Sequence, residues 1–463
     1  MKSTQGSVWP DGLPAPRRYW AIVAIWLAIF MSILDITVVN VALPTMANEL
    51  RTTPAASVWI VSSYQIAVTI VLLPLASLSE RLGASRVYLM GLVLFVAASL
   101  LCATSTRLDV LVLGRFCQGL GGGAIQAMNG VLLRFTFPEE RLGRGIGYNT
   151  LVVAITSASG PSIAAAILSV ASWQWLFVIN IPIGIVSFVI AYRSLPEIPL
   201  QDRKIDLISI LLNVGAFGAI FLVANDFAQH TLSVATWIEA TIALSTSVAL
   251  IKRSTRQSVP LVPIDLFQVR LLRLSYITAS CSWAAQTIAM VSLPFYFARK
   301  FGLNYVAIGL LITPWPVGVG LIAPIAGFLI ERVRAEVLSG VGLFIMGLGL
   351  LLLTAQPNNG WQYLVAIDMA ACGIGFGLFQ TPNNRTLLLA APPNRSGAAA
   401  GMLAVARLVG QTTGGVLVAL LFRLFGPASV AALFTAAAFS VAAFFVSARR
   451  FLGERPDTAT QPN

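Results

Sequence analysis

Two charged residues lie inside long apolar segments of this chain, where a charge serves ion pairing or proton binding. Asp35 interrupts the apolar stretch 19–43, and Arg115 interrupts a second one at 108–133. A carboxylate in the hydrocarbon zone of a bilayer costs roughly 2.5–3.5 kcal/mol on insertion scales, so ionisable groups there are functional candidates. The question that follows is which elements hold these two side chains, and at what depth.

The composition defines the setting of these charges. The chain is 57% hydrophobic and 10% charged, whereas a soluble domain has about 25% charged residues. This predicts an all-α polytopic membrane protein. The net charge of +12 does not indicate a nucleic-acid partner, because the basic residues are spread through short loops. Because segment 1–18 is polar and Pro-rich, we expect no cleaved signal peptide, and the four scattered cysteines predict neither disulfides nor a metal site.

Apolar stretches long enough to span a bilayer recur fourteen times. They are roughly 19–43, 55–78, 85–105, 108–133, 145–169, 174–195, 205–225, 232–251, 272–298, 305–330, 335–355, 361–382, 397–423 and 428–447. An even number of spans puts both termini on one side. The tails and loops of that side hold 23 of the 30 lysines and arginines, against five on the other side. This bias predicts that both termini are cytoplasmic.

With this topology, Asp35 and Arg115 lie at similar depths. Asp35 is about eight residues, or ~12 Å, below the outer surface, and Arg115 is about seven residues, or ~10 Å, below it. We therefore expect an ion pair between the first and fourth spans. A nearby guanidinium favours the ionised carboxylate, whereas burial favours the neutral acid. A change in their separation would load and release a proton; a static structural pair is the alternative.

The chain also matches itself at a fixed offset. Gln126 matches Gln380, and at the same spacing Asn129, Pro138 and Arg141 match Asn383, Pro392 and Arg395, as do several glycines including Gly119 and Gly373. The string at Glu80-Arg81 returns at Glu331-Arg332. These matches superpose spans that are eight apart and equally oriented. They predict two parallel six-helix repeats, an arrangement known from transporters, with two helices inserted between them.

Several strings give the chain a family resemblance. It resembles the fourteen-helix drug/proton antiporter branch of the major facilitator superfamily over nearly all of 19–447. The most specific strings begin at Leu34-Asp35, at Arg115-Phe116, at Gly160-Pro161 and at Trp173-Gln174. The predicted parts are a tail at 1–18, a six-helix bundle at 19–195, inserted helices and a linker at 196–271, a second bundle at 272–447 and a tail at 448–463.

The resemblance implies roles for residues in addition to Asp35 and Arg115, the implied proton-coupling pair. Gly160 and Pro161 would form the antiporter hinge, although Thr156, Ala164 and Ala165 stand where the family pattern prefers glycine. An ordinary packing kink is the alternative. The cytoplasmic gate would comprise Glu80, Arg81, Gly83, Glu331 and Arg332. The alternative is that these charged loops only set the orientation of the spans in the membrane. Candidates for the substrate cavity are Asn40, Gln126, Asp368, Gln380, Arg407 and Trp315.

The resulting expectation is a proton-coupled transporter, not an enzyme. It would be a monomer in the bacterial cytoplasmic (inner) membrane and would export small hydrophobic or amphipathic compounds, as in antibiotic resistance. The energy source would be the proton gradient, with no cofactor. The alternative is proton-coupled transport of a specific metabolite such as a sugar, amino acid or siderophore. For Trp315, the alternative to substrate contact is a role in core packing. For Asp368, the alternative to proton or cation binding is that it only lines a water-filled cavity.

Overall fold

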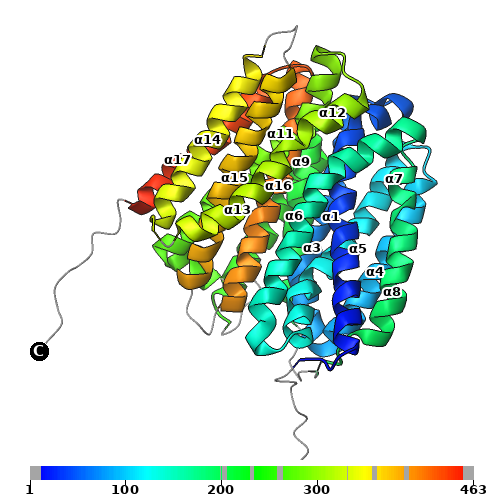
Figure 1. Cartoon of the computed structure of the whole chain (residues 1–463), viewed down its shortest axis with the longest axis vertical. Helices are drawn as coiled ribbons and strands as arrows, with labels where there is room; N and C mark the ends of the chain where they lie inside the picture. The colour runs from blue at the N-terminus through cyan, green and yellow to red at the C-terminus, as the bar shows by residue number, and fades with distance from the viewer. Residues whose placement is uncertain are drawn as a thin grey trace, which may run out of the picture.

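The computed structural model describes residues 12–198, 200, 206–229, 234–257, 264–330, 332–356, 362–390 and 396–451, with a few side chains inside these ranges excepted. In this part of the chain the regular elements are helices, which form two bundles side by side (Figure 1). The first bundle comprises α1 (Arg17–Glu49), α2 (Pro54–Ser57), α3 (Trp59–Leu82), α4 (Ala84–Ala103), α5 (Leu108–Thr136), α6 (Glu139–Val170), α7 (Trp175–Val178) and α8 (Asn180–Ser194).

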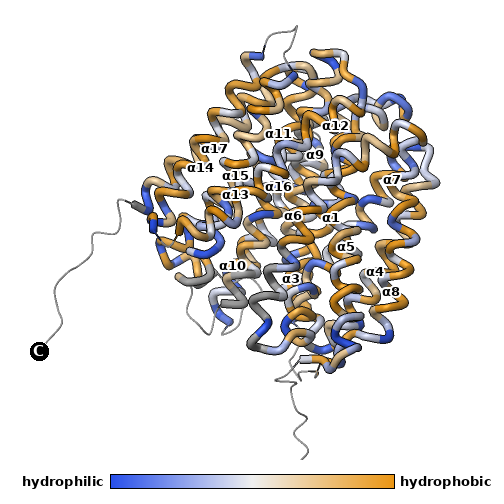
Figure 2. The backbone as a smooth tube through the Cα atoms, viewed as in Figure 1, coloured by the Kyte–Doolittle hydropathy of each residue, from blue (hydrophilic) through white to orange (hydrophobic). Residues whose placement is uncertain are grey.

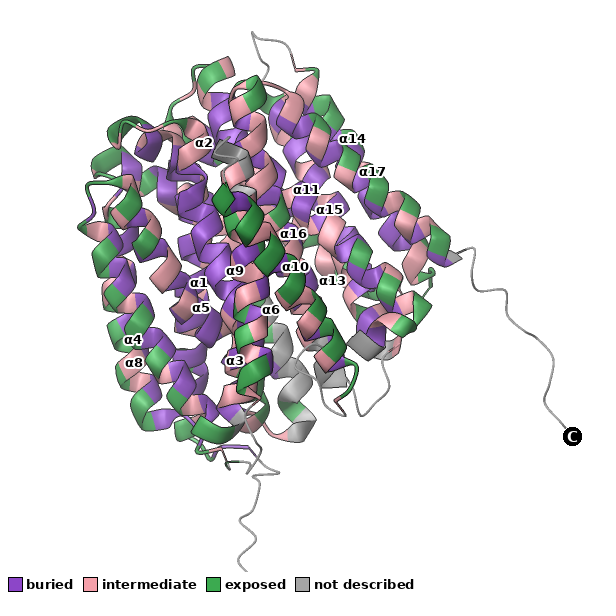
Figure 3. Ribbon diagram, turned by 180° about the vertical axis from the view of Figure 1, so that it is seen from behind, coloured by how far each residue is buried: buried purple, intermediate pink, exposed green. Residues whose placement is uncertain are grey.

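The second bundle and the connecting pair follow in the chain. The pair consists of α9 (Leu207–Gln229) and α10 (Val234–Ser254), and the short 3-10 helix η1 (Ile264–Gln268) follows it. The second bundle comprises α11 (Arg270–Lys300), α12 (Tyr305–Ile312), α13 (Pro314–Leu329), α14 (Ala335–Thr354), α15 (Gln362–Ala390), α16 (Ser396–Phe425) and α17 (Ala431–Phe451). Helix α9 packs against both α3 and α16, so the inserted pair lies on one face of the junction between the bundles (Figure 3).

Within the described ranges, twelve helices or continuous helix pairs are long and apolar enough to cross a membrane. Helices α9 and α11 occupy the other two predicted stretches but do not belong to that set. The apolar run of α9, Leu207–Val223, is shorter, and polar residues such as Ser275, Thr278 and Ser282 run along α11. Hydrophobic residues cover the lengths of the helices and hydrophilic ones gather toward their ends (Figure 2).

The same helix pairs pack together in both bundles. In the first, α5 lies between α3 and α4, and α1 packs on α6 and α8; in the second, α15 lies between α13 and α14, and α11 packs on α16 and α17. Glycines make this repeat close-packed. A Cβ on Gly121 would lie 2.6 Å from the carbonyl oxygen of Gly91, and one on Gly375 would lie 2.5 Å from that of Gly342. Both bundles therefore require glycine at the matching helix crossing.

The buried core joins the bundles mainly at one end. A large hydrophobic cluster there combines Leu43 and Met46 near the end of α1 with Phe295 and Phe297 near the end of α11. At the opposite end, two separate clusters are each drawn almost wholly from one bundle. The bundles are thus sealed together where α1 and α11 end, and are packed independently where these helices begin.

Candidate functional site

Asp35 and Arg115 form the ion pair that the depth argument predicts. Asp35, on α1, is 0% exposed, and Arg115, on α5, is 1% exposed. The Nη1 group of Arg115 donates to Asp35 Oδ2, and its Nε donates to the backbone carbonyl of Ile60 on α3 at 2.9 Å. The pair therefore ties together three helices of the first bundle and is closed to solvent in this arrangement.

Two amides complete the coordination of the carboxylate. Gln118 Nε2 and Asn180 Nδ2 each donate to Asp35 Oδ1 at 2.8 Å. Gln118 also accepts from Arg115 Nη1 at 2.6 Å and donates to Ser99 Oγ at 2.8 Å, so it bridges acid and base. Asp35 thus accepts from three side-chain donors. The three donors are directed at the two carboxylate oxygens, so the surroundings of Asp35 match its acceptor atoms.

Aromatic rings cover the guanidinium of Arg115. Its Cζ lies 4.5 Å from the ring centroid of Tyr64 and 5.7 Å from that of Phe177. The Tyr64 hydroxyl lies 3.1 Å from the Ser32 hydroxyl, one turn before Asp35 on α1. These rings exclude water, which strengthens the ion pair and makes an uncompensated charge there expensive.

Local sequence accounts for this geometry. Arg115 and Gln118 are three residues apart on α5, so their side chains share one face of the helix. Gly119 lets that helix approach α3, since a Cβ there would lie 2.4 Å from the Tyr64 carbonyl oxygen. Asn180 is the first residue of α8, after the short α7. Sequence reasoning did not assign roles to Gln118 or Asn180, although the helical spacing of Gln118 from Arg115 is a usable signal.

The predicted hinge residues lie between helices. A Cβ on Gly160 would lie 2.0 Å from Thr37 Oγ1 of α1. The carbonyl of Pro161 faces α12 of the other bundle, where a Cβ on Gly309 would meet it at 2.7 Å. The next residue, Ser162, has its Oγ 3.0 Å from Thr313 Oγ1, again across the two bundles. Helix α6 therefore contacts α1 on one side and the opposite bundle on the other.

The predicted gate is described in part. Gly83 joins α3 to α4 with a φ of 91°, a conformation that favours glycine. Arg81 is exposed, and exposed Arg332 lies with its Cζ 4.9 Å from the Phe328 ring. Glu331 and the side chain of Glu80 lie outside the described residues. Latching by ion pairs between these loops therefore stays a prediction.

Two cavity candidates are buried in packing contacts of the second bundle. Trp315 is 1% exposed, and its backbone carbonyl closely approaches Gly373, so it belongs to the packed core. Asp368 is 6% exposed and accepts from Gln356 Nε2 at 2.6 Å. Its helix, α15, is packed there against α14, where a Cβ on Gly349 would lie 3.1 Å from the Asp368 carbonyl oxygen. The depth of Asp368 in the membrane was predictable from the sequence, but the direction in which its side chain points was not.

Two of the remaining candidates, Gln126 and Arg407, meet at the junction of the bundles. Arg407 of α16 donates from Nη2 to Gln126 Oε1 of α5 at 3.1 Å, which links the two bundles. Its Cζ lies 5.8 Å from the ring centroid of Trp283 on α11. Asn40 and Gln380 are half-buried, and the buried Oδ1 of Asn40 has no hydrogen-bond partner among the described residues. Within the same described part, no cluster of residues has the composition of a metal site.

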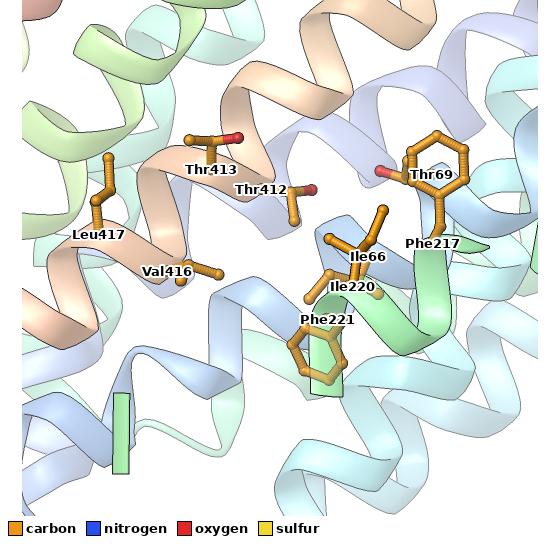
Figure 4. A pocket seen from close by; sticks show the side chains of 9 residues that line it. All are labelled: Ile66, Thr69, Phe217, Ile220, Phe221, Thr412, Thr413, Val416 and Leu417. Carbon is orange, nitrogen blue, oxygen red and sulfur yellow. The ribbon is translucent and has the colours of Figure 1, made fainter. Parts of the chain in front are cut away.

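A cavity of about 220 Å³ lies between α3, α9 and α16. Its walls carry apolar side chains from all three helices, with the hydroxyl-bearing Thr69, Thr412 and Thr413 among them (Figure 4). The buried Oγ1 of Thr412 has no hydrogen-bond partner in the described ranges. No charged residue lines this cavity, so it is suited to apolar contacts rather than to recognition of a charge.

Known proteins are similar to this chain over most of its length. The family model of the Major Facilitator Superfamily matches residues 25–255 and 275–463. Over 448 residues, 96% of this chain and 98% of the relative, the chain is 45% identical to "Uncharacterized transporter YebQ" of Escherichia coli (strain K12). It is 29% identical to "Multidrug resistance protein Stp" of Mycobacterium tuberculosis (strain CDC 1551 / Oshkosh). This match covers 85% of this chain and 74% of Stp.

Two further similarities extend this comparison. The chain is 28% identical to "Riboflavin transporter RibZ" of Clostridioides difficile (strain 630), over 84% of this chain and 85% of RibZ. The crystal structure of a POT family transporter in complex with a thioalcohol-conjugated peptide shares the fold, with a TM-score of 0.72, 15% identity, and coverage of 96% of this chain and 98% of that one. The family and these relatives are transporters rather than enzymes, and multidrug resistance proteins are among them. The chain is a member of the Major Facilitator Superfamily.

Proposed function

We propose that this transporter exports small hydrophobic or amphipathic compounds from the cytoplasm in exchange for protons. In this proposal fourteen helices cross the inner membrane, α9 and α11 included, with both termini in the cytoplasm and the monomer as the working unit. The observation that carries the proposal is the buried Asp35–Arg115 ion pair with its two amide donors. A closed, titratable pair is suited to proton coupling, because protonation of the acid removes the counter-ion of a buried base.

The proton step involves only residues of the first bundle. A proton from the outer side would add to a carboxylate oxygen of Asp35 and neutralise it. Arg115 would then keep the Gln118 oxygen and the Ile60 carbonyl as acceptors but lose its anionic partner. The uncompensated guanidinium favours rearrangement of α1 against α5 until water reaches the site. Loss of the proton to the cytoplasm would restore the ion pair.

The packing of the bundles supports alternating access. The large cluster that joins them contains Leu43 and Phe297, which lie at the outer end in the proposed topology. Helices α6 and α12 add contacts at the same end, including that between Ser162 and Thr313. The structure would therefore represent a state closed to the outside, in which substrate arrives from the cytoplasm.

The test is transport by the purified full-length protein in proteoliposomes with an imposed pH gradient. Three fluorescent compounds of different charge serve as probes: cationic ethidium, uncharged riboflavin and anionic carboxyfluorescein. We expect at least one to be moved against its gradient, and collapse of the pH gradient by an ionophore to stop that movement. Transport that continues unchanged after the collapse would refute proton coupling.

Transport of one specific metabolite is the second candidate. The similarity to a relative that is named a riboflavin transporter favours it. Deletion and overproduction in cells separate the two candidates. A multidrug exporter changes the tolerance to several unrelated toxic compounds, whereas a metabolite transporter changes the flux of one compound and leaves those tolerances alone.

A further inference from the structure

Arg407 is a cation without a counter-ion at the junction of the two bundles. Its Nη2 group donates to the neutral side chain of Gln126, and its Nε is buried with no hydrogen-bond partner. Among the described residues it forms no ion pair. A guanidinium carries five N–H donors in a planar fork, so the described residues use only a small part of its hydrogen-bonding capacity.

No other buried charge near the junction compensates this cation. The carboxylate of Asp35 is occupied by Arg115, Gln118 and Asn180. Asp368, the other buried acid among the described residues, is bonded to Gln356 at the junction of α14 and α15. The described residues near the junction of the two bundles therefore carry a net positive charge. A positive, partly water-excluded site attracts anions and repels cations.

The surroundings of Arg407 add an apolar wall to this charge. The indole of Trp283 lies beside the guanidinium, and it packs edge-to-face against Phe376 at a centroid distance of 5.0 Å. The two rings belong to α11 and α15, so they extend the site into the second bundle. A ligand with an anionic group at Arg407 could place an aromatic or aliphatic body along these rings.

We infer that Arg407 binds an anionic group, a carboxylate or a phosphate, of an amphipathic organic substrate. This inference rests on the proposed transport function and narrows its substrate class from amphipathic compounds in general to amphipathic anions. Because Arg407 of the second bundle donates to Gln126 of the first, an anion that binds to Arg407 lies at the junction between the two halves of the transporter. A guanidinium suits this role because it can bind both oxygens of a carboxylate or phosphate at once.

Binding to the detergent-solubilised full-length protein tests the inference without a membrane or a gradient. The same three probes are titrated, and carboxyfluorescein should bind more tightly than ethidium. Arg407→Gln should weaken carboxyfluorescein binding by at least ~10-fold, since it removes a charge-assisted contact. Arg407→Lys should retain part of the affinity. Riboflavin binding should change by less than about 2-fold, because its interaction with the aromatic wall involves no charge.

Two controls make the outcomes decisive. Arg299→Gln removes the same charge from the exposed end of α11 and should leave binding of all three probes unchanged. Competition by phosphatidylglycerol but not by inorganic phosphate or a short carboxylate would assign the site to a lipid headgroup and overturn the inference. Equal weakening of all three probes by Arg407→Gln, or tighter binding of ethidium by the unmodified protein, would also overturn it. None of these three results would bear on proton coupling, which is measured separately by transport under an imposed pH gradient.

Discussion

Replacement of Asp35 by asparagine separates the structural role of the ion pair from its proposed role in coupling. The substitution keeps the size of the side chain and removes its charge. Arg115 then remains in a site where it is 1% exposed, with the Gln118 oxygen and the Ile60 carbonyl as its acceptors. Loss of one partner of a buried ion pair costs about 3–5 kcal/mol, because the other charge is left uncompensated. We expect a loss of this size in the free energy of unfolding.

A second substitution isolates that cost. The double variant Asp35→Asn, Arg115→Gln removes both charges, and replacement of a whole buried pair is often close to neutral. The free energy of unfolding should therefore recover by about 3 kcal/mol relative to Asp35→Asn alone. Proton-coupled transport should not recover, because the carboxylate proposed to carry the proton is still absent. The second substitution is thus predicted to restore stability but not coupling.

Two assays measure these responses. Unfolding in mixed micelles, followed by tryptophan fluorescence, gives the free energies for the four members of the cycle. A pH-sensitive dye inside proteoliposomes reports the proton movement that substrate drives. Coupled transport by Asp35→Asn at the unmodified rate would refute the reasoning. So would a double variant in which transport returns together with stability, because the pair would then be only structural.

Three further predictions follow from the packing. Gly119→Ala should lower the free energy of unfolding by about 1–3 kcal/mol, because its Cβ would lie 2.4 Å from a backbone oxygen; Gly130→Ala on the same helix meets nothing within 4 Å and should be neutral or slightly stabilising. The hydrogen bonds from Arg253 lower the pKa of Asp206, so the contribution of this carboxylate to stability is present above about pH 4 and is lost as the pH falls further. Melting temperatures measured over a series of pH values should show this loss in the unmodified protein and not in Asp206→Asn. Ser162→Cys and Thr313→Cys, introduced into a protein without its four native cysteines, should form a disulfide under oxidation. This disulfide should stop transport until it is reduced. Continued transport by the cross-linked protein would contradict alternating access at this end.

Properties that depend on one coordinate along the membrane normal were predictable from the sequence. Depth follows from the number of residues between a side chain and the end of its span. That reasoning predicted the pairing of Asp35 with Arg115, and the structure contains the pair. The repeat was likewise visible as matched residues, and the structure shows the equivalent glycine contacts at Gly121 and Gly375.

Properties that depend on the rotation of a helix about its axis were not predictable. Asp368 has the depth expected for a central site, but it is buried beside Gln356 where α15 packs on α14. The rotation of its helix likewise places Trp315 in the packed core. Asn180 escaped notice because it reaches Asp35 only through the packing of α8 on α1, across 145 residues of sequence. The hydrophobic pattern of a membrane helix specifies this rotation weakly, since lipid and protein interior are both apolar.

The two bundles share a backbone arrangement, but the ion pair lies in the first and Arg407 lies in the second. Helix α5 of the first bundle contacts both sites. Arg115, Gln118 and Gln126 are three and eleven residues apart on α5, so they lie close to one face of the helix, with Gln126 about 16 Å from Arg115 along the axis. The first two contact the carboxylate, and the third contacts Arg407 of the other bundle. A shift of α5 when Asp35 is protonated would therefore also move Gln126.

This connection can be tested without touching either charge. Gln126→Ala removes the contact between the bundles but leaves the ion pair and Arg407 in place. We expect the variant to bind carboxyfluorescein with nearly unchanged affinity and to retain the stability contributed by Asp35, while the number of protons moved per substrate falls. An unchanged ratio would mean that the halves communicate through the packed clusters instead. A fall in the ratio without a fall in affinity would identify α5 as the element that links proton binding to substrate binding.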